Sequence, residues 1–356
     1  MNVILYVITI VCLYLLAVVG TIFIALYGAK VRRHKYSEKK IRMIRKHQKG
    51  IDMFFETGVP PSEIVPKTML EQEVLEEEFA RRLKNEDLLL KNIQPFIREH
   101  FLVSYRKRLN HSRPEVRMKS MVYIGLFKLT ELEKEINSLL NRKEISKQEK
   151  YQVYFTLASL SSRQVLEMLQ SGKGELPLFV RRGIMEIFLA ESDASPVIRE
   201  FHLYPLEIQE CILDVLQNMH VRNEEYLNLL EELIQDRQVM SLEEYLELRI
   251  RIWKGIANFG YFPKTSLILD SVPSAIAVPE RIMLARSMGS IRSKEFLPYL
   301  ETMLGDSSYL VRNESAKSII QYPEGMKSLN RIAAYHPDRF ARDIAGEWLE
   351  RSRKDA

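Results

Sequence analysis

The chain has 356 residues, of which 46% are hydrophobic, and its 52 Lys and Arg against 47 Asp and Glu give a formal net charge of +5. The basic excess is concentrated in residues 30–49, which hold ten Lys or Arg and one Glu, whereas residues 50–356 are net acidic. An acidic body without a basic, aromatic-lined groove disfavours nucleic-acid binding. Two cysteines exclude a disulfide framework and agree with a reducing cytoplasm.

Residues 1–29 carry no charged side chain and predict a transmembrane anchor. A helix rises about 1.5 Å per residue, so roughly 20 apolar residues cross a hydrocarbon core of about 30 Å. The run from Val3 to Tyr27 is long enough, and Tyr6 and Tyr27 are expected near the two interfaces. A cleaved signal peptide is the alternative, but the run exceeds the roughly 7 to 15 residues of such a segment and follows no basic stretch.

The basic block of residues 30–49 follows the apolar run directly and is expected to set the topology. Lys and Arg beside a span resist translocation, which predicts a single-pass protein of the cell membrane with its N-terminus outside and its C-terminal body in the cytoplasm. The same side chains are expected to meet anionic lipid headgroups. They are Lys30, Arg32, Arg33, Lys35, Lys39, Lys40, Arg42, Arg45, Lys46 and Lys49.

Residues 30–66 are expected to form a stem and a linker between the anchor and the body. Three prolines, at positions 60, 61 and 66, interrupt helix and, with Gly58, predict a short semi-rigid spacer that marks the domain boundary. The segment from Ser37 to Phe55 is compatible with a helix that either lies along the membrane surface or stands as a solvated stem.

The body, residues 67–356, is expected to be all-α. Apolar residues recur at i, i+3, i+4 and i+7 in segments of about 10 to 20 residues, and alternating strand patterns are nearly absent. Gly and Pro fall between these segments, and helices this short and closely spaced indicate stacked hairpins rather than a long four-helix bundle. Examples of the predicted helices are residues 69–83, 151–160, 180–190, 206–219 and 224–234.

Residues 285–320, "ARSMGSIRSKEFLPYLETMLGDSSYLVRNESAKSII", join the end of one helix to a complete helical hairpin. This segment resembles HEAT repeats, particularly the short bacterial form of about 30 residues per repeat that phycobilisome lyases contain. The resemblance implies a right-handed α-solenoid of stacked hairpins, in which leucines bury the first helix, Asp306 caps the second and Ala316 allows close helix contact. The matching positions are Ala285, Gly289, Leu297, Leu300, Leu304, Asp306, Val311, Arg312, Ala316 and Ile319.

Weaker copies of this pattern occur around residues 116, 180, 208, 249 and 341. The interval is 28 residues from position 180 to 208 and 30 from position 311 to 341, a periodicity typical of a solenoid. Arginines recur at one repeat position. We expect either a ladder that bonds Asp and backbone carbonyls between repeats, with Asp306 meeting Arg312, or a basic strip on the inner face. The residues are Arg117, Arg181, Arg312 and Arg342.

A second basic stretch, residues 104–119, departs from the acidity of the body and belongs to the first repeat. It is either a patch that approaches an anionic leaflet or an acidic membrane partner, or an exposed solvated face. The patch residues are Arg106, Lys107, Arg108 and Arg113.

Motifs with catalytic or metal-binding spacing are not found in the sequence. Seven histidines lack HExxH or Cys/His pairing, the Gly-Lys-Gly of residues 172–174 lacks phosphate-loop spacing, and the carboxylates are spaced like those of solvated helix faces. We therefore expect a protein that is not an enzyme, with no cofactor, no metal and no small-molecule substrate.

The resemblance to HEAT proteins implies protein binding more often than catalysis. The predicted function is that of a membrane-anchored cytoplasmic adaptor, which holds a protein partner near the bilayer and so raises its effective concentration. The partner is expected to belong to a membrane enzyme, a transporter or an envelope-assembly complex. A lyase-like modification enzyme on the same scaffold and a secreted solenoid binding protein are the alternatives.

Overall fold

The computed structural model describes residues 2–83, 87–172 and 176–354, with side chains from Tyr14 onward and none for residues 87–89. These residues form nineteen α-helices and six short 3-10 helices, without a strand, which confirms the all-α prediction. Residues 173 and 174 of the Gly-Lys-Gly turn lie outside the described part. The chain divides into two compact units, Met1–Thr156 and Leu157–Ala356.

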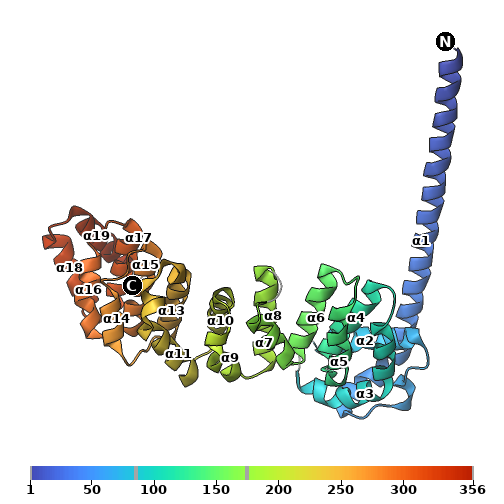
Figure 1. Ribbon diagram of the computed structural model, residues 1–356, viewed down its shortest axis with the longest axis horizontal. Helices are drawn as coiled ribbons and strands as arrows, with labels where there is room; N and C mark the ends of the chain where they lie inside the picture. Colours follow the sequence, from blue (N-terminus) through green and yellow to red (C-terminus); the bar gives the residue numbers. More distant parts are fainter. Residues whose placement is uncertain (1, 84–86, 173–175, 355–356) are drawn as a thin grey trace. The chain divides into compact units, whose positions relative to one another are not determined.

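Unit 1 is built around the C-terminal part of one long helix, α1, onto which α2, α3 and a 3-10 turn pack. Helix α4 then packs against α3, and α5 follows on the same helix (Figure 1). Its elements are α1 (Asn2–Thr57), η1 (Ser62–Ile64), α2 (Met69–Leu83), α3 (Asp87–Leu109), α4 (Pro114–Leu126), η2 (Thr130–Leu132), α5 (Glu133–Ser138), η3 (Leu139–Asn141) and α6 (Lys147–Ser159), the last of which contains the boundary between the units.

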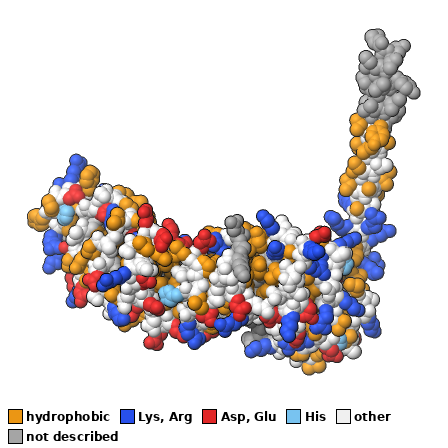
Figure 2. All heavy atoms as spheres, viewed as in Figure 1, with side chains coloured by type: hydrophobic (Ala, Val, Ile, Leu, Met, Phe, Trp, Pro, Cys, Tyr) orange, Lys and Arg blue, Asp and Glu red, His pale blue; other side chains and the backbone are white. Residues whose placement is uncertain are grey.

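Helix α1 is long and apolar enough to span a membrane, and it is the one such helix found among the described residues, with a mean hydropathy of 1.8 in its most apolar window. Its side chains from Tyr14 to Tyr27 are largely exposed, as apolar side chains are when lipid rather than protein surrounds them. Figure 2 shows these apolar side chains above a cluster of Lys and Arg at the start of the body.

The C-terminal end of α1 belongs to the core of unit 1. Ile51 and Phe54 are fully buried, and the Phe54 ring lies 6.0 Å from that of Phe79 and 5.3 Å from that of Phe96. This end of α1 therefore neither lies along a membrane surface nor stands free in solvent, in contrast to both expectations for the stem. Its apolar positions are a core face, and the packing of unit 1 begins well before residue 67.

The proline-rich segment 58–66 is likewise attached to unit 1 rather than free. It contains the 3-10 turn η1, whose Ile64 is fully buried. A Cβ added to Gly50 of α1 would lie 2.8 Å from the Ile64 side chain, so the turn packs directly on the helix backbone. The prolines shorten the connection between α1 and α2 without making it an independent spacer.

Unit 2 contains a row of longer helices, α8, α10, α13, α15, α17 and α19, in which each packs against the next (Figure 1). Shorter helices join them, as α16 joins α17 and α18 joins α19. The elements are α7 (Arg163–Gln170), α8 (Leu178–Glu191), α9 (Ser195–Arg199), η4 (Phe201–Leu203), α10 (Leu206–Asn218), α11 (Glu224–Gln235), α12 (Arg237–Ser241), η5 (Glu243–Tyr245), α13 (Leu246–Phe259), α14 (Thr265–Ser271), α15 (Val278–Ile291), η6 (Lys294–Phe296), α16 (Leu297–Met303), α17 (Tyr309–Ile319), α18 (Gly325–Tyr335) and α19 (Arg339–Lys354).

One glycine fixes how closely two helices of this row approach. A Cβ added to Gly289 of α15 would lie 2.5 Å from the Cβ and Oγ atoms of Ser318 on α17. Such a separation is far below van der Waals contact, so no larger residue fits without moving a helix. Ala285 and Ala316, on the same two helices, are fully buried, so small side chains recur where the pair packs.

Phe54→Ala tests whether α1 is part of the core of unit 1. Removing a fully buried ring from this aromatic cluster is expected to destabilise unit 1 by about 3–5 kcal/mol. The measurement is hydrogen exchange of the α2 and α3 amides in the full chain. Met53→Ala, at a neighbouring side chain that is 46% exposed, serves as the control and is expected to cost about 0.5 kcal/mol or less. Equal protection in both variants would contradict the packing role of α1.

Candidate functional site

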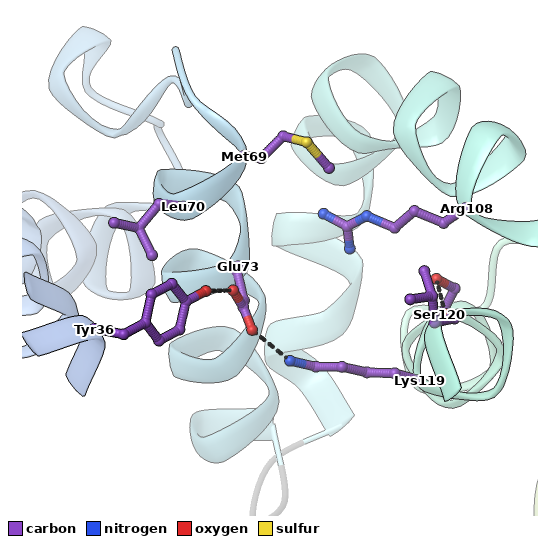
Figure 3. A pocket seen from close by; sticks show the side chains of 8 residues that line it. Tyr36, Met69, Leu70, Glu73, Arg108, Lys119 and Ser120 are labelled. Atoms are coloured by element: carbon purple, nitrogen blue, oxygen red, sulfur yellow. Dashed lines mark hydrogen bonds and ion pairs between the residues drawn. The ribbon is translucent and has the colours of Figure 1, made fainter. Parts of the chain in front are cut away.

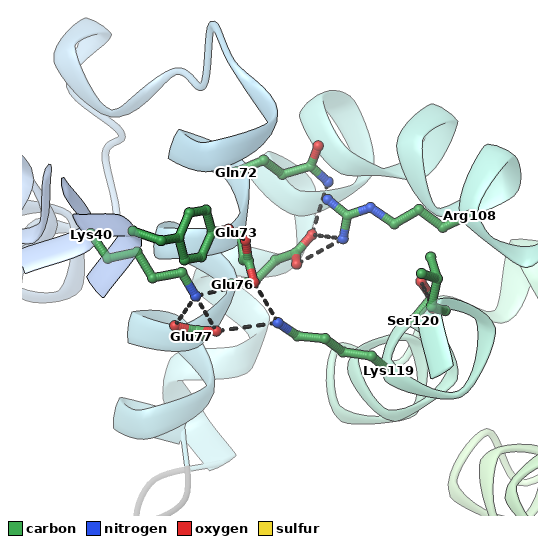
Figure 4. A network of polar contacts seen from close by, with 10 residues as sticks. Lys40, Gln72, Glu73, Glu76, Glu77, Arg108, Lys119 and Ser120 are labelled. Atoms are coloured by element: carbon green, nitrogen blue, oxygen red, sulfur yellow. Dashed lines mark hydrogen bonds and ion pairs between the residues drawn. The ribbon is translucent and has the colours of Figure 1, made fainter. Parts of the chain in front are cut away.

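Four charged side chains and one tyrosine join α1 to α2 and α4 (Figure 4). Lys40 of α1 donates to both Glu77 oxygens at 2.8 and 3.0 Å and lies 3.1 Å from Glu73. Lys119 of α4 donates to Glu73 at 2.7 Å and to Glu77 at 3.2 Å, and the Tyr36 hydroxyl donates to Glu73. Lys40 therefore points into the protein, unlike the headgroup contact predicted for it.

The other nine basic residues of the block remain exposed on α1. Two of them approach acids loosely: Arg42 lies 4.0 Å from Glu38, and Lys46 lies 3.9 Å from Glu71. Exposed pairs at such distances contribute little stability, so these cations remain available to an anionic surface.

The electrostatics of this junction depend on Glu73. Burial alone raises the pKa of a carboxylate, but hydrogen bonds from Lys119, Tyr36 and Lys40 outweigh it and lower the pKa of Glu73 to about 2. Burial and the same carboxylate raise the pKa of Tyr36 to about 12. Glu73 is thus held ionised, as the common acceptor of three donors from two other helices.

A second, more deeply buried pair lies behind this junction. Glu76 of α2 is fully buried, and Nη1 of Arg108 on α3 donates to both of its oxygens at 2.9 Å. Gln72 adds a bond of 2.8 Å to the same carboxylate. Burial raises the pKa of Glu76, and Arg108 opposes this shift. Arg108 is therefore a core residue and not part of an exposed basic patch.

A pocket of about 430 Å³ opens between α1, α2, α3 and α4 (Figure 3). The α2 side carries Met69, Leu70 and Glu73, and the opposite side carries Arg108 and Lys119. Glu73 accepts from Lys119, and Arg108 is bonded to the buried Glu76, so the charged groups of the lining already have partners. The lining residues are Tyr36, Met69, Leu70, Glu73, Arg108, Val116, Lys119 and Ser120.

The structure does not bring the four predicted patch residues together as one basic surface. Arg106 pairs with Glu135 at 2.7 Å, and Arg108 is committed to Glu76. Lys107 and Arg113 are exposed, and within the described part of the chain no ion pair is found for them. Two unpaired cations remain where a patch of four was expected.

Arg117, one of the recurring arginines, uses two sides of its guanidinium. Nη1 of Arg117 donates to the carbonyls of His111 and Ser112 at 2.6 and 2.9 Å, in the loop that precedes its own helix. Its Nε and Nη2 atoms donate to both oxygens of Glu149, which is fully buried on α6. The guanidinium thus bonds its own loop on one side and an acid of the next repeat on the other.

Arg249 and Arg281 repeat this geometry in unit 2. Nη1 of Arg249 donates to the carbonyls of Val239 in α12 and of Leu242 just after it, at 2.9 and 2.7 Å, and its Nε donates to Glu280 at 2.8 Å. Nη1 of Arg281 donates to the Ile276 carbonyl, and its Nε and Nη2 bond Asp306 at 2.7 and 3.0 Å. We call the edge formed by Nε and Nη2 the side-on edge.

The partner predicted for the Asp306 carboxylate, Arg312, was wrong. The Asp306 carboxylate bonds Arg281, whereas Nη1 of Arg312 donates to the Asp306 backbone carbonyl at 2.6 Å. Asp306 Oδ1 also accepts from the Ser308 amide at 2.8 Å, just before α17. Among the other predicted members, Arg181 bonds Glu207, and Arg342 bonds the carbonyls of the loop before α19.

Sequence reasoning missed the acids of this arrangement. Glu149 lies 32 residues after Arg117, and Glu280 lies 31 residues after Arg249. Both acids are the third residue of their helices. The spacing of about one repeat between each arginine and its acid was the signal in the sequence that would have paired them.

Groups suited to catalysis are not assembled at the junction. Burial raises the pKa of the Cys211 thiol to about 11, which leaves it a weak nucleophile in unit 2. In the residues that the structure describes, no three His, Cys, Asp or Glu side chains lie together as a metal site would need.

No protein-family model and no curated protein matches this chain. Among solved structures, it is similar to the crystal structure of an engineered protein from the Northeast Structural Genomics Consortium. The match has 13% identity and a TM-score of 0.37, and covers 89% of this chain and 99% of the other. At that TM-score the likeness decides neither fold nor function.

The pH dependence of the junction follows from Glu73. Its pKa is about 2 in the folded chain against an ordinary 4.5, so its stabilisation is present above pH 4.5 and is lost as the pH falls toward 2. Glu73→Gln is expected to lower the unfolding midpoint of unit 1 at pH 6 and to flatten its fall between pH 4.5 and 3. Hydrogen exchange of the unit 1 amides at pH 6, 4.5 and 3 measures how the stability of unit 1 changes with pH. The exposed Glu63→Gln is the control. An unchanged slope would contradict the role of Glu73.

Arg108→Ala is expected to destabilise unit 1 by about 3–5 kcal/mol, because it leaves Glu76 buried without its cation. Adding Glu76→Gln removes that buried charge and is expected to recover part of the loss. Arg106→Ala, which breaks only an exposed pair, is expected to cost about 1 kcal/mol or less. The three variants are compared by urea unfolding, which is monitored through hydrogen exchange of the α3 amides. A double variant less stable than Arg108→Ala would contradict the buried-charge explanation.

Proposed function

We propose that this protein is a single-span membrane scaffold that binds protein partners through stacked helical pairs. The continuity of α1 is the observation that supports this most strongly. The helix runs without interruption from an apolar segment to Phe54 in the core of unit 1. Unit 1 would therefore be held at a fixed distance from the bilayer by a helix rather than by a flexible linker.

The proposal includes a HEAT-like, right-handed solenoid. The row of helices from α8 to α19, their short partners and the recurring arginine geometry support it. Repeats that contact only their neighbours leave long surfaces free for partners. The pocket between α1 and α4 is a second place for a partner, close to the proposed membrane surface.

The proposed topology places the N-terminus outside and the body in the cytoplasm, with part of the basic block at the lipid headgroups. The headgroup layer is about 5–7 Å deep on each side. At about 1.5 Å per residue, Arg33 lies about 6 Å beyond Ala29 along the axis of α1, Lys39 about 15 Å and Lys49 about 30 Å. The first basic residues of the block would meet headgroups, and the later ones would lie beyond them.

Membrane attachment is tested with the full chain carrying an epitope after residue 356. We expect the protein to stay in the membrane in alkaline carbonate, with residues 1–29 retained by mass. The epitope is expected to resist protease in intact cells and to be digested in inverted vesicles. A soluble protein lacking residues 1–29 would instead indicate the secreted alternative.

Partner binding is tested by purification from native membranes of the full chain and of Met69→Glu. Met69 lines the pocket and is 70% exposed, so the substitution is expected to spare the fold and to reduce recovery of a specific partner at least fivefold. Val59→Glu, which changes a similarly exposed side chain outside the pocket, is the control. Equal recovery with both variants would move the binding surface away from this pocket.

A further inference from the structure

Two of the recurring arginines lack the acid that the others bind. Nη1 of Arg312 donates to the carbonyls of Asp306 and Ser307 at 2.6 and 3.1 Å, and Nη1 of Arg342 does the same with His336 and Pro337 at 2.6 and 3.0 Å. These contacts reproduce the loop bonds of Arg117. Within the part of the chain whose side chains the structure describes, residues 14–83, 90–172 and 176–354, however, neither side-on edge has a carboxylate partner.

The side chain found against Arg312 on α19 is Phe340 rather than an acid. Its ring lies 5.1 Å from Arg312 Cζ, and Arg312 Nε is buried without a hydrogen-bond partner. A buried donor left in this state has lost its hydration without gaining a hydrogen bond, which costs stability. Phe340 itself is 61% exposed, so the ring that lies against the Arg312 guanidinium is open to solvent and has room to move away.

We propose that the side-on edges of Arg312 and Arg342, the first of them beside Phe340, bind a carboxylate side chain of a partner protein. The chain provides the precedent, since Glu149, Glu280 and Asp306 occupy this edge in other repeats. The loop carbonyls already hold both guanidiniums in place, so little side-chain entropy is lost on binding. Planar, bidentate donors favour a carboxylate over a more weakly oriented ion.

Neighbouring residues indicate what should flank that acid. Leu310 and Tyr309, at the start of α17, are 57% and 51% exposed beside Arg312. In other repeats Glu149 and Glu280 stand in the first turn of a helix. The expected ligand is therefore an acid in the first turn of a helix, with apolar side chains beside it.

The charges around the edges do not cancel this preference. Arg339 is paired loosely with Asp343 at 3.6 Å, and Asp338 bonds the Phe340 amide at 2.8 Å. Asp306 is taken by Arg281. Arg312 and Arg342 therefore add two positive charges that the facing elements α17 and α19 do not balance.

This inference rests on the proposed scaffold function and names the chemistry of a partner. Its test measures peptide binding, which is a separate result from membrane attachment. The probe is a fluorescent peptide with the sequence of residues 146–158, "SKQEKYQVYFTLA", whose fourth residue is the glutamate of position 149. Anisotropy is measured with the full chain in neutral-lipid nanodiscs. Saturable binding below about 1 mM is expected, with at least about tenfold weaker binding when that Glu is Gln.

Substitutions in the protein locate the site. Arg342→Lys keeps the charge but cannot bond both the loop and a carboxylate, and is expected to weaken binding about tenfold, as is Arg312→Gln. Arg339→Gln, an exposed arginine of the same helix, is expected to leave it within about twofold. Phe340→Ala is expected to strengthen binding, because the Arg312 edge is uncovered. Unfolding midpoints identify any variant that fails to fold.

Three results would overturn the inference. They are equal binding of the Gln peptide, an equal loss in Arg339→Gln, and no saturable binding up to 1 mM. Competition by inorganic phosphate as effective as by the Glu peptide would also overturn the assignment to a protein carboxylate and indicate a general anion site. Loss of membrane insertion with intact peptide binding would refute only the proposed anchoring.

Discussion

The double use of the guanidinium in Arg117, Arg249 and Arg281 is the interaction on which the packing of neighbouring helical pairs depends. Short helices joined by tight loops leave carbonyls without partners, and burying them costs stability unless a donor reaches them. Arg117 meets this need in unit 1 and Arg249 in unit 2, each with one nitrogen, while the remaining edge binds an acid of the next repeat. One side chain thus closes its own loop and fixes its neighbour, so neighbouring repeats are positioned together.

Unit 1 uses the same kind of chemistry to attach a helix that is not part of a repeat. The aromatic cluster around Phe54 buries the end of α1, and the contacts of Lys40 and Tyr36 with Glu73 fix the helix further along. Apolar packing supplies most of the stability, while the ion pairs restrict how α1 rotates against α2. The pocket beside Tyr36 lies next to these contacts and is lined by side chains of α1, α2, α3 and α4.

Much of the helical structure was predictable from sequence because apolar periodicity reports burial directly. The helix expected at 69–83 is α2, and that expected at 206–219 is α10 to within one residue. The apolar face of the stem was also visible, but periodicity does not say whether lipid, solvent or protein covers it. Phe54 and Ile64 needed the tertiary structure. Asp306 was paired with the nearest arginine in sequence, whereas the fold brings Arg281 to it across two helices.

In the proposed scaffold, the unbroken course of α1 would couple distance from the membrane to rotation about the membrane normal. Each residue inserted between Ala29 and Tyr36 would lift unit 1 by about 1.5 Å and turn it by about 100°. Seven residues make nearly two full turns, so an insertion of seven would return the pocket close to its original direction, whereas an insertion of one or two would not. The number of residues in this segment would therefore determine which way the pocket faces around the membrane normal. Neither the apolar run nor the body determines that direction alone.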